Sequence, residues 1–341
     1  MLSNMGIQLS LLDSAVLSSG LSSLSGSIRD EISNNLSADL KSLEGRRVIF
    51  ATSSNRQPLV QWYEASSTLL PEYVEINRSP TLLSAVDSSI VPICDLADGT
   101  LYVSRVAVVF SIGGGPSNYI RLGPFLCHSN EGSLSSGQVG LERTVNDERF
   151  LEAAIRTQME RSAVAHLSQF LRGSIILIDG TLRLTSSQSD FPKIISEAKR
   201  NNNTLIGISK TTKIRSISQI ASQLRGKTGA PFFCRLSYGH TDPSLSTSVI
   251  AKFRDDGLAF RTDILGGDVC EALALLAGND TFYRGYPECL RLAHHLSVFT
   301  PFEVVCIRSH LSRFLKLVEL PSEDTREVIL RWFWSFKGRI Q

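Results

Sequence analysis

The sequence predicts a mixed α/β protein, for three reasons. Apolar segments of strand length lie on both sides of a long amphipathic helix near residue 160. Two strands before this helix are joined by a tight turn at Asp98-Gly99, which is typical of an antiparallel hairpin. The strands after it are short, wholly apolar and separated by helical segments, which favours buried parallel strands. We therefore expect a sheet in which antiparallel strands come first and parallel crossover strands follow.

Composition limits the class of protein. Of the 341 residues, 42% are hydrophobic, which is enough to bury a core and excludes a disordered chain. The net charge of +2 excludes a polycation, so any nucleic-acid site must be a local patch. The six scattered cysteines are expected to be reduced and mostly buried. Without an apolar run of membrane length or a signal peptide, the sequence predicts a cytoplasmic protein that does not contact a membrane.

Residues 1–80 are predicted to form an N-terminal helical region and a connector. The first 40 residues contain 11 serines, yet apolar residues recur there at helical spacing in two groups. These groups are Leu9, Leu12, Val16 and Leu17, and then Ile28, Ile32, Leu36 and Leu40. We expect two amphipathic helices broken near Ser19-Gly20, followed by a connecting segment through residues 71–80.

Residues 81–310 are predicted to form the central domain, which begins with strands. Segments 82–90 and 100–110 are expected to pair as a hairpin, and 119–125 is expected to be a third strand. Segment 128–140 is polar and rich in glycine and serine, which favours a loop.

A long helix is predicted from about residue 147 to 171, followed by alternating strands and helices. These are strands at 174–179 and 204–209, helices at 193–201 and 217–224, a hairpin over 249–264, helices near 268–277 and 287–298, and a final strand at 302–307. Residues 311–341 are predicted to form a C-terminal helical tail. Its stripe of Ile329, Trp332, Phe333 and Phe336 fits core packing or an interface anchor.

Two aspartates stand at the ends of predicted buried strands. Asp87 lies near the end of the first strand, and Asp179 ends a later one. Because sites in α/β sheets gather at the carboxyl ends of strands, these carboxylates are expected to converge. Two carboxylates repel each other unless a positive group separates them, and Mg²⁺ or Mn²⁺ suits such oxygen ligands. The alternative is that both aspartates only cap turns.

Five segments, in order along residues 81–298, resemble motifs of the NurA family of nucleases. They are AVDSS, LYVSRVAVVF, ILIDGTLRL, LIGISKT and GYPECLRLAHHL, with the long helix between the second and the third. The resemblance implies a ribonuclease-H-like mixed sheet flanked by helices, and a site that uses Mn²⁺ or Mg²⁺. It also implies a DNA exonuclease that cuts single strands internally and acts in DNA end resection. Such a protein would work as a homodimer beside a HerA-like hexameric ATPase in the prokaryotic cytosol.

The resemblance also assigns metal ligands. Asp87 and Asp179 match the two metal-binding aspartates of the family, although Ser88 stands where the family usually has glycine. The family has a further acidic residue on the intervening helix, for which Glu160 is preferred and Glu152 is the alternative. Three carboxylates can hold two divalent ions roughly 3.5–4 Å apart. Glu160 also fits an ordinary solvated helix residue.

Three more residues match family positions. Lys210 follows a buried strand and can offset charge on a phosphate, although a surface lysine is equally common there. Tyr286 lies in the GYP motif. His294, with His295 beside it, can ligate a metal or shuttle a proton, and otherwise fits a core histidine.

Positive charge is concentrated between residues 193 and 227, where eight lysines and arginines face one acidic residue. Such a patch favours binding to DNA phosphates, and the alternative is a solvated surface. The residues expected to contact DNA are Lys193, Lys199, Arg200, Lys213 and Arg215.

Other functions are less consistent with the sequence. The segment LRGKTG does not form a nucleotide-binding loop, because Ala221 stands where that motif needs glycine. A kinase of the actin type is disfavoured because the sequence contains no second glycine-rich phosphate loop and no adenosine motif. The main alternative is a non-catalytic DNA-binding or scaffold relative. The N-terminal stripe is expected to contact a dimer mate or the ATPase, with packing on its own core as the alternative.

Overall fold

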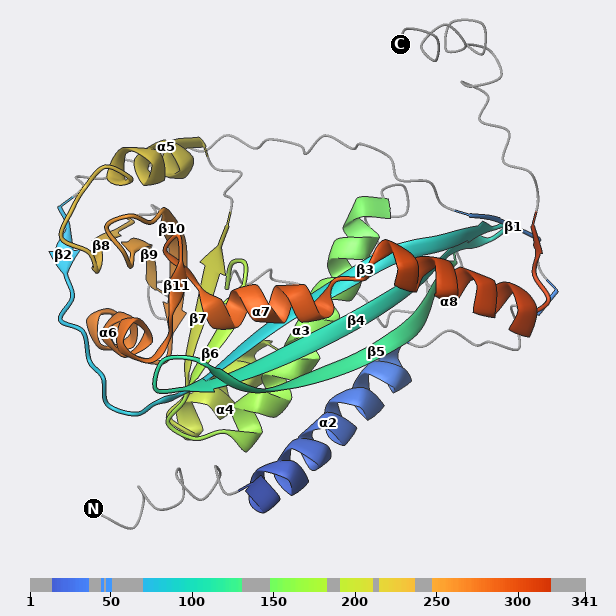
Figure 1. The fold of residues 1–341 in the computed structure, drawn as a ribbon, viewed down its shortest axis with the longest axis horizontal. Coiled ribbons are helices and arrows are strands. Elements are labelled where there is room, and N and C mark those ends of the chain that lie inside the picture. Colours follow the sequence, from blue (N-terminus) through green and yellow to red (C-terminus); the bar gives the residue numbers. More distant parts are fainter. Residues whose placement is uncertain are drawn as a thin grey trace, which may run out of the picture.

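The computed structural model describes residues 14–36, 44–45, 47–50, 70–130, 148–182, 191–210, 215–236 and 247–319. Within these residues, eleven strands form one sheet in the order β13-β1-β3-β6-β7-β10-β9-β8-β2, and β4 joins β3 to β5 (Figure 1). The strands are β1 (Arg47–Phe50), β2 (Glu72–Tyr73), β3 (Leu82–Leu96), β4 (Gly99–Ile112), β5 (Pro116–Asn130), β6 (Ile175–Asp179), β7 (Thr204–Ser209), β8 (Phe232–Arg235), β9 (Thr247–Lys252), β10 (Ala259–Leu265) and β13 (Val318–Glu319).

A two-stranded hairpin and seven helices complete the described part of the chain. The hairpin is formed by β11 (Phe282–Tyr283) and β12 (Tyr286–Pro287). The helices are α2 (Ser14–Leu36), α3 (Glu148–Phe170), α4 (Phe191–Arg200), α5 (Arg215–Leu224), α6 (Val269–Asn279), α7 (Glu288–Ser297) and α8 (Pro301–Phe314).

The order of strand directions confirms the predicted fold class. β3, β4 and β5 pair antiparallel, whereas β6 pairs parallel with both β3 and β7. The long helix α3 leads from the antiparallel strands to β6, and α4 leads from β6 to β7. β10, β9 and β8 then extend the sheet in antiparallel pairs.

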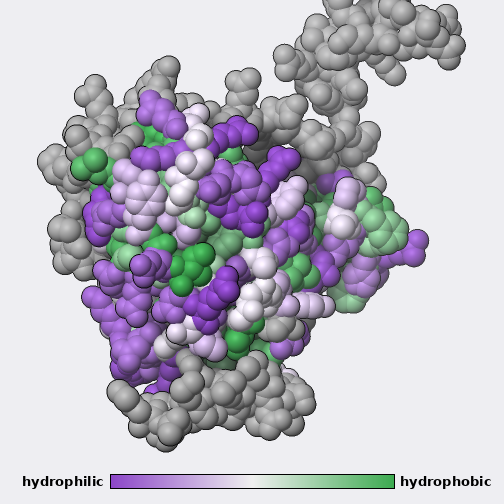
Figure 2. All heavy atoms as spheres, turned by 60° about the vertical axis from the view of Figure 1, so that its left-hand side comes forward, coloured by the Kyte–Doolittle hydropathy of each residue, from purple (hydrophilic) through white to green (hydrophobic). Residues whose placement is uncertain are grey.

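Both faces of the sheet are covered by helices, and side-chain alternation explains why. In β3, Ala85 belongs to the core under α6 and α7, whereas its neighbour Val86 belongs to the core under α2, α3 and α4. Successive strand residues point to opposite faces, so a strand that is apolar throughout fits a sheet buried on both sides. Figure 1 shows α7 on one side of β3 and β4, and α2 and α3 on the other. The face that Figure 2 shows is mainly hydrophilic where it is coloured, with apolar residues in small groups.

The predicted break near Ser19-Gly20 is wrong, because α2 is continuous from Ser14 to Leu36. A β-carbon on Gly20 would lie 3.1 Å from the ring of Phe170 at the end of α3. The glycine therefore allows close packing of two helices and does not end one. Ile28 and Ile32 are buried in the protein's own core, whereas Leu9, Leu12, Leu36 and Leu40 are not covered by the side-chain description.

The predicted final strand at 302–307 is also wrong, because this segment belongs to α8. Thr300 caps the helix: its hydroxyl accepts a hydrogen bond from the backbone N–H of Glu303, whose side chain bonds back to Thr300. Pro301 occupies the first turn, where its missing N–H costs nothing. The apolar run Val304–Ile307 looked like a strand, but this capping box starts a helix.

Smaller differences concern the connections. β5 continues to Asn130, so the first residues of the predicted loop at 128–140 form strand and the rest lie outside the described residues. The connecting segment through residues 71–80 contains β2, which pairs with β8 at the edge of the sheet. The stripe from Ile329 to Phe336 lies outside the described residues. The division at residues 80 and 310 stays a prediction.

The burial of most cysteines agrees with the expectation from the sequence. All six cysteines are free thiols, and four of them are buried. Burial raises the pKa of the Cys94 thiol to about 12, so it stays protonated at neutral pH. No helix in the described part of the chain is long and apolar enough to cross a membrane.

Candidate metal centre

The carboxyl end of β6 lies beside the middle of β3, and this brings two aspartates together. Val86 of β3 is in register with Ile178 of β6, so the following residues, Asp87 and Asp179, lie on neighbouring strands. Asp87 is completely buried, and the side chain of Asp179 is 14% exposed. The two aspartates converge as predicted, at the carboxyl end of β6. The prediction that Asp87 lies near the end of its own strand is wrong, because β3 continues to Leu96.

The side chain of His294 in α7 reaches the same two aspartates. Its Nδ1 lies 2.7 Å from Asp87 Oδ2, and the Ser297 hydroxyl donates to the same oxygen at 3.3 Å. Ligand atoms of Asp87, Asp179 and His294 all lie within 4.8 Å of one another. A proton on Nδ1 would leave the lone pair of a neutral imidazole on Nε2. His295 instead lies 3.3 Å from Arg291, outside this group.

Glu160 of α3 lies next to this group but is held by other side chains. The Ser88 hydroxyl donates to its Oε1 at 2.6 Å. Burial raises the pKa of Glu160 to about 7, with Asp87 and Asp179 adding to the rise, whereas Arg156 and Ser88 oppose it. Glu152 lies two turns earlier, about 12 Å further along the helix axis. Between the two predicted glutamates, the structure thus favours Glu160.

Lys210 and Tyr286 both contact Asp179. Lys210 Nζ lies 2.6 Å from Asp179 Oδ2, and the Tyr286 hydroxyl donates to Asp179 Oδ1 at 3.1 Å. Burial and the nearby carboxylate raise the pKa of Tyr286, so its hydroxyl stays a donor. All six residues predicted for the site are therefore gathered where the carboxyl end of β6 meets the middle of β3.

The sequence over residues 81–299 matches the NurA domain. The chain belongs to the NurA family. No curated protein matches the sequence. Among solved structures, the NurA nuclease from Sulfolobus solfataricus is similar, with 17% identity, a TM-score of 0.50, and coverage of 71% of this chain and 86% of that one. At this identity the likeness shows a shared fold.

Two further structures are similar over much of their length. A second NurA structure has 11% identity and a TM-score of 0.41, and covers 78% of this chain and 91% of that one. The catalytic domain of human endonuclease V has 14% identity and a TM-score of 0.35, with coverage of 70% and 85%. The fold of this NurA family member is the mixed sheet flanked by helices that the sequence predicted.

Arg156 is a member of the centre that sequence reasoning missed. Its Nε donates to the Ser88 carbonyl at 3.1 Å, and its terminal nitrogen lies 3.5 Å from Asp87 and 3.6 Å from Glu160. It precedes Glu160 by four residues, so both side chains lie on one face of α3. This spacing was the available signal. Arg156 places one positive charge between two carboxylates of the NurA centre.

The turn after Asp179 is fixed by its neighbours in β7 and β10. A β-carbon on Gly207 would lie 2.7 Å from the Gly180 carbonyl oxygen, so only glycine leaves room for this turn. The Leu182 N–H donates to Asp263 at 3.1 Å, and buried Arg261 forms an ion pair with Asp263. Sequence reasoning also missed these residues, since nothing near them in sequence marks them.

The basic residues predicted for DNA are not gathered at the metal centre. Lys199 and Arg200 are exposed at the end of α4, where the Asn203 N–H bonds to the Ala198 carbonyl just before β7 begins. Lys199 and Arg200 thus lie near the end of the sheet at which β7 starts. Asp179 lies at the opposite end, where β6 finishes. Lys213 lies outside the described residues, and Arg215 begins α5 without a described side chain.

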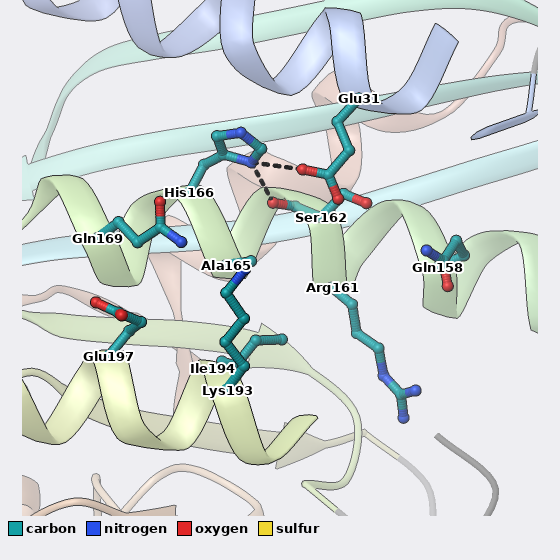
Figure 3. A pocket seen from close by; sticks show the side chains of 10 residues that line it. All are labelled: Glu31, Gln158, Arg161, Ser162, Ala165, His166, Gln169, Lys193, Ile194 and Glu197. Carbon is teal, nitrogen blue, oxygen red and sulfur yellow. Dashed lines mark hydrogen bonds and ion pairs between the residues drawn. The ribbon is translucent and has the colours of Figure 1, made fainter. Parts of the chain in front are cut away.

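A separate pocket of about 360 Å³ lies between α2, α3 and α4 (Figure 3). Lys193 and Arg161 line it, and His166 Nδ1 lies 3.2 Å from Glu31 across its upper side. None of the residues that gather around Asp179 lines this pocket. The pocket belongs to the helical layer, on the face of the sheet that α7 does not cover.

Proposed function

We propose that this NurA family member is a metal-dependent deoxyribonuclease that removes nucleotides from DNA ends and also cuts single strands internally. The observation that carries the proposal is the convergence of Asp87, Asp179 and His294 within 4.8 Å. Two carboxylates on neighbouring strands repel each other, and a divalent cation between them would relieve this repulsion.

The donor set fits Mn²⁺ or Mg²⁺. Carboxylate oxygens are the ligands that both ions prefer, and an imidazole nitrogen favours Mn²⁺ among the two. We propose that Asp87, Asp179 and His294 hold one ion, and that Glu160 joins the aspartates around a second. Bound ions would supply water activation and stabilisation of the leaving oxygen.

The protein's own residues then act on charge and protons. Glu160, whose carboxylate accepts a hydrogen bond from the Ser88 hydroxyl, can accept a proton from an attacking water once it is ionised. Lys210 can turn from Asp179 to an oxygen of the scissile phosphate, because it is partly exposed and its side chain is flexible. Tyr286 keeps Asp179 oriented by the hydrogen bond from its buried hydroxyl.

The test is a nuclease assay of the purified protein with Mn²⁺, Mg²⁺ or EDTA. Linear duplexes labelled at either end and a circular single strand distinguish exonuclease from endonuclease products. We expect Asp87→Asn and Asp179→Asn to lower cleavage by at least about 100-fold, since even outer partners of metal ligands cost 10–100-fold. The matched control is Asp95→Asn, which changes an exposed aspartate of the same strand that bonds only locally to Thr100.

A non-catalytic DNA-binding or scaffold relative is the second candidate. It would bind DNA with the same affinity in all three conditions and leave every substrate intact. Full cleavage by Asp179→Asn would contradict the metal centre, whereas absence of cleavage in the wild-type protein with either ion would favour the scaffold.

We further propose a homodimer that acts beside a HerA-like hexameric ATPase in DNA end resection. Light scattering should give twice the chain mass, and a monomer would contradict the dimer. Because α2 packs on the protein's own core through Ile28 and Ile32, deletion of residues 1–40 would also unfold the chain. Deletion of residues 1–13 leaves α2 in place and is the better test of ATPase binding by the N-terminal stripe.

A further inference from the structure

An exposed tyrosine stands beside the metal centre on the β11–β12 hairpin. Tyr283 pairs with Tyr286 across this hairpin. Residues directly opposite each other in an antiparallel pair have β-carbons about 4.5–5.5 Å apart. Tyr286 is buried and bonds to Asp179, whereas Tyr283 is 57% exposed. Tyr286 thus supports the metal centre, while the ring of Tyr283 on the paired strand is open to solvent.

The hairpin is held rigidly. Its turn residues, Arg284 and Gly285, have φ of 52° and 82°, and the Arg284 carbonyl accepts a bond from Leu258 N–H at 2.9 Å. A β-carbon on Gly285 would lie 2.9 Å from the Leu258 carbonyl oxygen. On the other side of the hairpin, Phe282 stacks on Phe253 with ring centroids 4.8 Å apart. Tyr283 is therefore presented from a fixed backbone.

Two guanidinium groups surround the exposed ring. The Cζ atoms of Arg284 and Arg291 lie 5.8 Å and 5.2 Å from the centre of the Tyr283 ring. Arg291 is balanced by an ion pair with Glu288. Within the described residues no carboxylate forms an ion pair with Arg284, which leaves its positive charge to an outside partner. Arg284 also occupies a left-handed conformation, which is uncommon for a residue other than glycine, asparagine or aspartate.

We propose that Tyr283 stacks on an unpaired base of single-stranded DNA, with Arg284 and Arg291 next to the adjoining phosphates. Exposed aromatic rings among positive charges are the means by which proteins hold single strands without reading sequence. A paired base within a duplex does not offer its face to such a ring. The inference rests on the proposed nuclease function and adds that the substrate strand is unpaired where it reaches the metal centre.

The test measures binding in EDTA, so that it does not depend on cleavage. The probe is an oligonucleotide that carries 2-aminopurine, whose fluorescence falls when the base stacks. We expect Tyr283→Ala to weaken single-strand affinity by at least about fivefold and to abolish the quenching. Tyr283→Trp should retain both, because the indole also stacks. Arg284→Gly suits the left-handed turn and should weaken binding and flatten its salt dependence.

Tyr73→Ala is the matched control. Tyr73 is 58% exposed and lies in β2, five strand spacings or about 24 Å from β6. Equal affinity and quenching in wild type and Tyr283→Ala, or an equal loss in Tyr73→Ala, would overturn the proposal. If the wild-type protein binds no DNA at all, the proposed nuclease function fails with it. If it binds and cleaves DNA equally well without Tyr283, only the proposed stacking of Tyr283 on a base fails.

Discussion

Arg156 shows how single residues set the charge of the metal centre. Its guanidinium lies within 3.6 Å of two carboxylates, Asp87 and Glu160. A divalent cation would meet the same carboxylates, so the arginine and the cation oppose each other electrostatically. The arginine is 43% exposed and can therefore turn outward to a phosphate when the cation binds.

We expect Arg156→Ala to lower the stability of the metal-free protein by no more than about 1 kcal/mol, because solvent screens the pair. The same change should enlarge the rise in Tm that Mn²⁺ produces, since the cation no longer competes with a fixed positive charge. Thermal unfolding with and without Mn²⁺ measures both effects. Arg156→Lys should behave like the wild type, and an unchanged Mn²⁺ response in Arg156→Ala would contradict the competition.

Among single residues, the sequence predicted those site residues that follow an apolar strand segment or belong to a motif. Asp87 and Asp179 each follow an apolar segment, so the sequence predicted both near strand ends. Asp179 does end β6, whereas Asp87 lies within β3. Arg156 and Asp263 are marked by no such pattern, because their roles depend on contacts between elements distant in sequence. The pairing of Glu160 with Ser88, 72 positions away, likewise became visible only in the folded chain.

At the scale of elements, the start of α8 is stabilised by charge as well as by its cap. Glu303 accepts hydrogen bonds from buried Arg105 and from the Thr300 N–H. Arg105 first, and then the Thr300 contacts, hold the pKa of Glu303 down at about 2. Since the folded pKa lies below the ordinary value, this stabilisation is present above about pH 4.5 and is lost as the pH falls towards 2.

Glu303→Gln should accordingly lower the free energy of unfolding by about 2 kcal/mol at pH 7, after allowance for partial exposure. The difference from the wild type should shrink between pH 4.5 and pH 2. Urea unfolding at a series of pH values checks this. Glu44→Gln, which removes a carboxylate 59% exposed beside Lys316, should change nothing, and a pH-independent effect of Glu303→Gln would refute the charge argument.

The contact between β7 and the turn after β6 gives a second prediction for an element. Gly207→Ala would push a methyl group against the Gly180 carbonyl and displace the turn that follows Asp179. Cleavage should therefore fall by about tenfold or more, because small displacements of positioning groups cost up to about 100-fold. Gly226→Ala is the control, since its β-carbon meets nothing within 4 Å. Equal activity of the two variants would show that the turn tolerates the shift.

At the scale of the whole molecule, the basic end of α4 and the metal centre lie at opposite ends of the parallel strands β6 and β7. If this end of α4 contacts DNA, the path must extend along the length of these strands. Lys199→Glu with Arg200→Glu should then weaken binding to all DNA sequences alike and flatten the salt dependence. Anisotropy measured at several salt concentrations tests this. An unchanged salt dependence would show that DNA does not contact this end of α4, and would leave the β11–β12 hairpin as the proposed contact.

The architecture was largely predictable because the periods of strands and helices are local properties of a sequence. One exception has a local cause, since Val304–Ile307 has the composition of a strand, yet a capping box precedes it. The other has a distant cause, since Gly20 lies within a helix and packs against Phe170 of α3. The positions of α4 and its lysines relative to the centre depend on the direction of a crossover. Charge counts along the chain do not contain that direction.

The centre is assembled from distant parts of the chain, and this bears on its synthesis. The contact between His294 and Asp87 joins residues 207 positions apart, and Tyr286 meets Asp179 across 107 positions. A growing polypeptide on the ribosome therefore has both aspartates long before it has the histidine. Contacts of such range form late, because the intervening segment must be ordered first. If the proposed nuclease activity holds, a cell that makes this protein is exposed to it only after the chain has been translated beyond His294 and folded.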